Sequence, residues 1–344
     1  MDYFAPLATK LKKRKDLNFD LIQEAYVFAY DAHQGQKRAS GEDYIMHPTA
    51  VAELIYDIGG DEESIIASLL HDTVEDNKNI ALDHIRKKFG ENVEQLVDGV
   101  TKIEKVFLKG TESLDHKIET IRKWLNALHT DVRIAVIKLC DQLHNLGTLH
   151  AFKNKEKQAR IAQQTLDIYV KVSKWLSISK MQEKLEKLAL PHVLDSKTSK
   201  YLFKKESEYK ENTKKAIKIF EQSCENQNMS FKVGHIPLQK AYFSLQEGKP
   251  SKEVFAAHIY CIVPNIEKCY SALYFFHGTW RQKKGSFDDY INSPRMNGSR
   301  ALNTRLIFEG GTEVEVHIMT EEMFNYSQKG VASFCFSKNV LPYN

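Results

Sequence analysis

The sequence predicts an α-helical bundle followed by an α+β domain with a mixed β-sheet. In residues 20–190, apolar side chains recur at three- and four-residue steps, which is the period of amphipathic helices. A highly charged stretch follows at 195–230. Beyond Gly234, runs of β-branched and aromatic residues replace the helical pattern. We therefore expect two domains, residues 1–195 and 196–344, each long enough to bury its own core.

The helical half is divided by glycine and proline residues. Apolar residues with helical spacing occur in five segments: 21–32, 80–89, 118–128, 134–139 and 161–172. Gly35, Pro48, Gly59 and Gly90 lie between these segments or at their ends, where chain reversals are expected. These breaks predict a bundle of short and medium helices.

The second half is predicted to contain three strands. Residues 254–263 are rich in β-branched and aromatic side chains, which favours a strand. Segments 304–308 and 312–318 flank Glu309-Gly310-Gly311 and predict a hairpin, and apolar and polar residues alternate in the second of them. The charged stretch before these strands is expected to start as a linker and to continue as a solvent-facing helix.

Composition limits the classes of function. The 49 basic and 45 acidic residues give a net charge of +4, so bulk charge does not indicate a nucleic-acid partner. The five cysteines are scattered without CxxC spacing, which argues against a disulfide framework and favours a reducing compartment. No apolar run reaches about 18 residues, and the N-terminus lacks a secretory signal pattern. A cytoplasmic protein with no membrane partner is expected, and its oligomeric state stays open.

An unusual group of polar residues follows the apolar run Ile65–Leu70. His71, Asp72, Glu75 and Asp76 would fall within an arc of about 140° on a helix. One imidazole and three carboxylates on one face suit a divalent cation. The alternative is an exposed acidic helix end, but a His-Asp pair that directly follows Leu-Leu is more often buried and then needs a partner.

Further ligands are available from two other segments. His47 precedes a proline at an expected helix start, and Asp141 lies on an apolar helix. Lys138, Asn145 and Thr148 share the face of Asp141. Two imidazoles and two carboxylates with open positions accept Mn²⁺, Fe²⁺ or Zn²⁺, and the lack of thiolates argues against a structural zinc site. The candidate ligands are His47, His71, Asp72 and Asp141.

Five motifs occur in order along this half. They are AHQGQKR at 32–38, YIMHP at 44–48, LHDTVED at 70–76, LVDGVTK at 96–102 and KLCDQLHN at 138–145. Together they resemble the HD-type hydrolase domain of the RelA/SpoT alarmone proteins. The resemblance implies removal of pyrophosphate from the 3′ position of guanosine 3′,5′-bis(diphosphate), (p)ppGpp, with Mn²⁺ as the metal.

The same resemblance implies roles for individual residues. The four candidate ligands would bind the metal, while Glu75 and Asp76 would position or deprotonate the attacking water. Arg38 would flank the base, and Asn145 with Thr148 would line the nucleoside pocket. Lys138 would reach a phosphate, although a snorkelling surface lysine is an equal alternative. On the residues alone, Arg38 is equally well read as a surface cation. Spacing alone favours a polar helix face for Asn145 and Thr148.

Several positions depart from the family pattern. Ala39 replaces a usual lysine, and Gln142 and Gly147 replace usual arginines. The base and the number of phosphates therefore stay open, and an adenosine analogue, (p)ppApp, is an alternative substrate. A nucleotide-sensing regulator with a vestigial hydrolase is a second alternative. The complete set of ligands together with Glu75 and Asp76 argues against a sensor.

A second set of motifs lies between about residues 240 and 337: CYSAL at 269–273, HGTW at 277–280, FDDYI at 287–291, NG at 297–298, LNT at 302–304 and VEVHIMT at 314–320. Together they resemble the pyrophosphokinase domain of the same family. Phe255 stands where the family has its catalytic aspartate, Tyr260 where it has an arginine in the strand, and Ser299 where it has the base-stacking tyrosine. After the catalytic glutamate, His317 and Met319 replace a glutamine and an arginine. A phenylalanine cannot bind Mg²⁺, and the retained Glu315 alone cannot sustain pyrophosphoryl transfer. We expect a pseudo-synthetase domain without alarmone synthesis and with a structural or regulatory role.

Overall fold

The fold is taken from a computed structural model of the chain. It describes residues 3–107, 114–224, 228–234, 236, 238–249, 254, 256–308, 311–333, 335 and 336. The chain divides into two compact units, one built from residues up to 155 with those after 330, and one from residues 156–330. The sequence-based domain boundary at 195 differs from this division, because the helix that precedes residue 195 packs on helices of the second unit.

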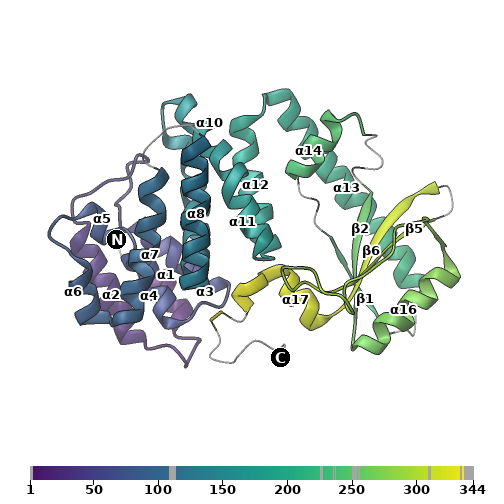
Figure 1. The fold of residues 1–344 in the computed structure, drawn as a ribbon, viewed down its shortest axis with the longest axis horizontal. Helices are drawn as coiled ribbons and strands as arrows, with labels where there is room; N and C mark the ends of the chain where they lie inside the picture. The colour runs from purple at the N-terminus through teal and green to yellow at the C-terminus, as the bar shows by residue number, and fades with distance from the viewer. Residues whose placement is uncertain are drawn as a thin grey trace. The chain divides into compact units, whose positions relative to one another are not determined.

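In the residues described, the first unit is built from helices, as Figure 1 shows, with one isolated β-bridge between Lys37 and Asp43. Its elements are α1 (Ala5–Leu11), α2 (Phe19–Ala32), α3 (Met46–Asp57), α4 (Glu62–Leu70), α5 (Thr73–Asp76), α6 (Leu82–Phe89), α7 (Glu91–Phe107), α8 (Leu114–Thr130), α9 (Val132–Gly147) and the short 3₁₀ helix η1 (Leu149–Ala151). Helix α4 packs against α2, α3 and α7, and every residue from Ser64 to Leu70 is buried. An apolar helix buried on all sides places whatever follows it inside the bundle.

The second unit combines helices with one mixed sheet. Its helices are α10 (Lys155–Gln164), the π-helical turn η2 (Thr165–Tyr169), α11 (Val170–Trp175), α12 (Ser179–Val193), α13 (Ser196–Ser223), α14 (Leu238–Gln246), α16 (Ile266–Thr279) and α17 (Glu321–Lys329). Its strands are β1 (Ser230–Val233), β2 (Ala257–Val263), β3 (Arg281–Gln282), β4 (Asp288–Asp289), β5 (Leu302–Ile307) and β6 (Glu313–Thr320). The predicted fold class is confirmed.

The sheet has the order β1-β2-β6-β5-β3, with β4 paired to β5. Strands β2 and β6 are parallel, and the other pairs are antiparallel. Strands β5 and β6 correspond to the predicted hairpin, although Glu309 and Gly310 lie outside the described residues. Phe255 also lies outside them. Helix α16 packs on β2, β5 and β6 and buries Phe276 against the apolar side of the sheet.

Helix α13 differs from the expected linker. It begins at Ser196, because the Asp195 side chain accepts hydrogen bonds from the N–H groups of Lys197 and Thr198 and so caps the helix. Its exposed charged residues form ion pairs along one side, as between Glu211 and Lys215. Its opposite side is buried rather than solvent-facing. No helix among the described residues is long and apolar enough to cross a membrane.

Candidate metal centre and nucleotide site

The centre lies where helix α4 ends. Leu70 is the last residue of α4, and the short helix α5 begins at Thr73, so His71 and Asp72 form a turn between two helices. The side-chain hydroxyl of Thr73 donates to the Leu70 carbonyl, 2.7 Å away, and satisfies one carbonyl at this helix end. The expected single helix through residues 71–76 is interrupted at His71 and Asp72, and Glu75 and Asp76 follow on α5.

The four candidate ligands come together from three elements. His47 lies in the first turn of α3, and its Nε2 is 3.1 Å from Asp141 Oδ1 and 3.5 Å from Asp72 Oδ2. His71 Nε2 is 3.2 Å from Asp72 Oδ1 and 3.8 Å from Asp141 Oδ1. All four residues are buried. Two imidazole nitrogens thus face two carboxylates at distances that a single cation can bridge.

The hydrogen bonds of His71 test whether a metal fits here. Its Nδ1 lies 2.8 Å from the Ser68 carbonyl oxygen, which can only accept, so Nδ1 carries the proton. Nε2 then presents a lone pair toward the carboxylates, and it is buried without a hydrogen bond of its own. Donation of the second ring N–H to a carbonyl is the usual arrangement for a metal-bound histidine. A divalent cation fits this set of residues.

The charges of the centre agree with this fit. Burial lowers the pKa of the His47 imidazole to about 3, which keeps it neutral and able to bind a metal. Burial also acts to lower the pKa of His71, but the carboxylates of Asp72 and Asp141 outweigh it and raise that pKa. The two carboxylates therefore stabilise a positive charge at this place.

Three further side chains hold the carboxylates. Lys138 Nζ lies 2.5 Å from Asp141 Oδ2, and Asn145 Nδ2 donates to Asp141 Oδ1 over 2.7 Å. The hydroxyl of Tyr44 donates to Asp72 Oδ2 over 2.9 Å. Lys138 is only 3% exposed, so it is not a snorkelling surface lysine. Lys138 instead pairs with Asp141, one of the candidate ligands.

Arg38 reaches the same place from the loop between α2 and α3. Its Nη2 donates to Asn145 Oδ1 over 2.6 Å, and its guanidinium lies over the Tyr44 ring. Thr148 ends α9, and its hydroxyl donates to the Asn145 carbonyl over 3.2 Å. The structure therefore brings Arg38 and Asn145 into contact and places Thr148 at the end of the same helix.

Glu75 and Asp76 lie on α5, beside the buried ligands. Glu75 is partly exposed and Asp76 is exposed, so both are open to water. Burial and the charges of Asp72 and Asp76 raise the pKa of the Tyr44 hydroxyl. Asp76 and the candidate ligand Asp72 therefore both lie near this hydroxyl. This arrangement suits carboxylates that handle water beside a cation.

The sequence analysis gave no role to three residues around the centre. Tyr44 holds Asp72, and His144 Nδ1 lies 2.8 Å from His47 Nδ1. His33 stacks on the Tyr44 ring with a centroid distance of 4.5 Å. A local signal existed for two of them, because Tyr44 is three residues before His47 and His144 is three residues after Asp141.

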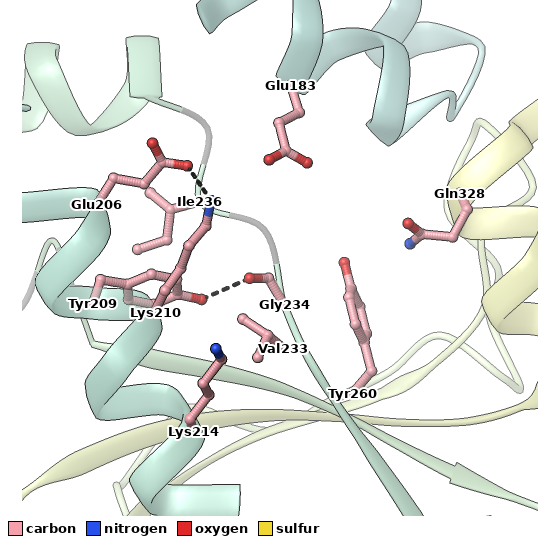
Figure 2. A pocket seen from close by; sticks show the side chains of 10 residues that line it. All are labelled: Glu183, Glu206, Tyr209, Lys210, Lys214, Val233, Gly234, Ile236, Tyr260 and Gln328. Carbon is pink, nitrogen blue, oxygen red and sulfur yellow. Dashed lines mark hydrogen bonds and ion pairs between the residues drawn. The ribbon is translucent and has the colours of Figure 1, made fainter. Parts of the chain in front are cut away.

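In the second unit, the positions that differ from the synthetase pattern surround two cavities. Figure 2 shows the first, of about 300 Å³, with Tyr260 on one side and the ion pair of Glu206 with Lys210 on the other. The second, of about 230 Å³, is bordered by Tyr260, Ser299, His317 and Met319. Tyr260 packs edge-on against the Phe324 ring, so the expected arginine position is filled by an aromatic cluster.

Comparison with known proteins gives two matches along the chain. Residues 25–178 match the HD domain, and residues 249–339 match the region found in RelA/SpoT proteins. The first match contains all four candidate ligands, and the second contains strands β2 to β6.

Curated relatives cover nearly the whole chain. It is 36% identical over 335 residues to a GTP pyrophosphokinase of Myxococcus xanthus, covering 92% of this chain and 43% of that protein. It is 35% identical over 324 residues to a probable guanosine-3′,5′-bis(diphosphate) 3′-pyrophosphohydrolase of Synechocystis, covering 91% of this chain and 42% of the relative. A guanosine-3′,5′-bis(diphosphate) 3′-pyrophosphohydrolase of Aquifex aeolicus is 34% identical over 324 residues, covering 91% of this chain and 45% of that protein.

The chain spans less than half the length of these relatives, and their names divide between synthesis and hydrolysis. Along this chain the HD domain comes first and the RelA/SpoT region second. With these matches and the geometry of the centre, the chain belongs to the RelA/SpoT family of enzymes.

Proposed function

We propose that this protein hydrolyses (p)ppGpp at the 3′ position, releasing pyrophosphate and leaving GDP or GTP. The observation that carries the proposal is the convergence of His47, His71, Asp72 and Asp141, with the His71 Nε2 lone pair buried and unpaired. The names of two relatives support the same reaction.

The residues divide into holding, water-handling and positioning roles. His47, His71, Asp72 and Asp141 would hold a divalent cation, for which we propose Mn²⁺ ahead of Fe²⁺ or Zn²⁺. Such a cation, when bound, lowers the pKa of water and stabilises phosphate charge. We assign to Glu75 and Asp76 the orientation of the attacking water and the uptake of its proton.

Lys138 holds one oxygen of Asp141, and Asn145 donates to the other. We therefore propose that Lys138 acts on the substrate through Asp141, by fixing this carboxylate and balancing its charge. Arg38 is held by Asn145 and supplies a guanidinium face for the base or a phosphate. We place Thr148 beside the nucleoside, at the end of the helix that carries Asn145.

A second substrate deserves a direct comparison. Ala39, Gln142 and Gly147 remove three cations that the family usually carries near this site. Fewer cations weaken the recognition of phosphates and alter the surroundings of the base. For this reason (p)ppApp is the specific alternative to (p)ppGpp.

We further propose that the second domain does not synthesise alarmone. Tyr260 lies on β2 where an arginine is expected and is part of an aromatic cluster with Phe324 and His317. Phe255 replaces the expected Mg²⁺-binding aspartate. Because several relatives are named for synthesis, incubation with ATP and GDP or GTP in Mg²⁺ is the test; formation of ppGpp would overturn this part.

The hydrolase proposal is tested with the full chain stripped of metal by a chelator. Pyrophosphate release is measured from ppGpp and ppApp after adding Mn²⁺, Fe²⁺, Zn²⁺ or Mg²⁺. We expect pyrophosphate release from ppGpp to depend on the metal. Asp141→Asn should lower the rate by more than about 100-fold, because mutating even the hydrogen-bond partner of a metal ligand lowers activity by about 10- to 100-fold.

The matched control is Asp83→Asn, which removes an exposed carboxylate of the same unit that pairs with Lys87. It should retain full activity. Release from ppApp alone would change the assigned base. No release from either nucleotide with any of these metals would overturn the hydrolase proposal.

A further inference from the structure

Three side chains of the second unit form another cluster of metal-binding type. His258 lies on β2, and Glu315 and His317 lie on β6. The parallel pairing of these strands sets His258 opposite Glu315 and Tyr260 opposite His317. Residues two apart on a strand share a face of the sheet, so Glu315 and His317 point the same way. One ligand atom from each of the three lies within 4.8 Å of the others.

The distances inside the cluster are those of separated ligands. Glu315 Oε2 is 3.6 Å from His258 Nε2, and Glu315 Oε1 is 3.6 Å from His317 Nε2. Both distances are too long for hydrogen bonds. Around a tetrahedral cation with bonds of about 2.0–2.1 Å, neighbouring ligands lie a little over 3 Å apart. Small side-chain rotations would therefore close the cluster around an ion.

Two neighbours orient the cluster from behind. The Asn303 side-chain oxygen lies 2.7 Å from His317 Nδ1 and accepts a hydrogen bond from it, which leaves the Nε2 lone pair toward Glu315. Arg305 Nη2 donates to Glu315 Oε2 over 2.7 Å, and Glu313 offsets part of the arginine charge. The other carboxylate oxygen, Oε1, stays available on the side of His317.

We propose that His258, Glu315 and His317 form a second divalent-cation site in the chain, of a kind that prefers Zn²⁺ to Mg²⁺. The preference follows from the ligands, because imidazole suits Zn²⁺ and the neighbouring transition metals, whereas Mg²⁺ prefers oxygen atoms. The site is distinct from the HD centre, the cluster of His47, His71, Asp72 and Asp141, since all its residues belong to the second unit. It does not depend on the proposed hydrolase function.

Three protein ligands leave a fourth position of a tetrahedral ion open. His317 borders the 230 Å³ cavity, together with Arg295 and Arg300. A water molecule or an anionic group, such as a carboxylate or phosphate oxygen, has the chemistry to complete the coordination from that side. The bound ion would also tie β2 to β6, so it should stabilise the sheet.

The test is the Zn²⁺ stoichiometry of the full chain after metal removal, measured by calorimetric titration. We expect two equivalents for the wild type. His317→Asn retains a donor for Asn303 but removes the Nε2 ligand, and His258→Phe retains a ring without nitrogen. Each should lose one equivalent or weaken it by more than about 100-fold. Asp141→Asn should lose the other equivalent, which separates the two sites.

The control is His277→Asn, since this imidazole belongs to the same unit but bonds to Thr304 outside the cluster. It should retain two equivalents. If a cluster variant fails to fold by circular dichroism, the decision passes to Co²⁺ absorption spectra of Asp141→Asn, where an intact second site gives the bands of a tetrahedral centre. Two equivalents in both cluster variants, or no such bands, would overturn the proposal, whatever the outcome of the hydrolase assay.

Discussion

The two units bury acidic groups in opposite ways. In the HD centre, Asp141 faces the ammonium group of Lys138 and the imidazole of His47, and these partners hold the pKa of Asp141 well below its usual range despite its burial. In the second unit, Glu186 is 1% exposed and receives hydrogen bonds from the neutral side chain of Gln182 and the N–H of Gln239. Burial outweighs these bonds and raises the pKa of Glu186 to about 7.

The difference shows what distinguishes a ligand site from a structural acid. A carboxylate kept ionised in the interior needs positive charge nearby, and a cluster of such carboxylates with neutral imidazoles favours a metal. A buried carboxyl whose hydrogen-bond donors are all neutral takes up a proton instead. The cluster of His258, Glu315 and His317 belongs with the first type, although its side chains are about one fifth exposed.

The largest effect that would sharpen this comparison is expected for Glu75→Gln. Glu75 is assigned to water and not to the metal, so the variant should lower kcat by about 10²- to 10⁴-fold while leaving Mn²⁺ affinity unchanged. Glu91→Gln, at an exposed ion pair with Arg86, is the control. Loss of Mn²⁺ binding in Glu75→Gln would show that the residue is a ligand and that our division of roles is wrong.

An intermediate effect is expected for Glu186→Gln. The pKa of Glu186 is higher in the folded than in the unfolded chain. The protonated carboxyl therefore stabilises the folded state below about pH 4.5, and this contribution is lost as the pH rises to about 7. The variant should therefore be more stable than the wild type above pH 7, by on the order of 3 kcal/mol, and equal to it near pH 4. Urea unfolding across this range measures the difference.

The control for this prediction is Glu183→Gln. Glu183 lies on the same helix, is more exposed and pairs with Lys187. Its removal should give no gain in stability at high pH. A stability difference for Glu186→Gln that does not change with pH would contradict a protonated acid.

The smallest effect is expected for Arg38→Gln. The variant loses the hydrogen bond from the guanidinium to Asn145 and a cation beside the substrate. It should raise KM about 10-fold and leave kcat nearly unchanged. Lys37→Gln, at the neighbouring exposed pair with Asp43, should change neither value. If kcat falls as much as kcat/KM does, Arg38 acts in the transition state and not in substrate binding. Comparing ppGpp with ppApp in this variant shows whether Arg38 reads the base.

Local sequence determined the elements of this protein, since helical periodicity and alternation depend on near neighbours. It predicted helices α2, α6, α8, α9 and α13, the strands β2, β5 and β6, and the helix start that carries His47. The expected linker after residue 195 was wrong, because Asp195 caps helix α13 and the helix starts directly at Ser196. Residues 156–195 pack within the second unit. Such packing depends on side chains far away in the sequence.

The sequence also supplied the candidate ligands, partly by spacing and partly by family resemblance. Only the tertiary structure brings His47 of α3 and Asp141 of α9 to 3.1 Å from one another and shows that Lys138 bonds to Asp141. Likewise, alternation predicts that Glu315 and His317 share a face, but only the parallel pairing of β2 with β6 adds His258 to them. Strand order and helix packing are non-local, and short-range patterns carry no information about them.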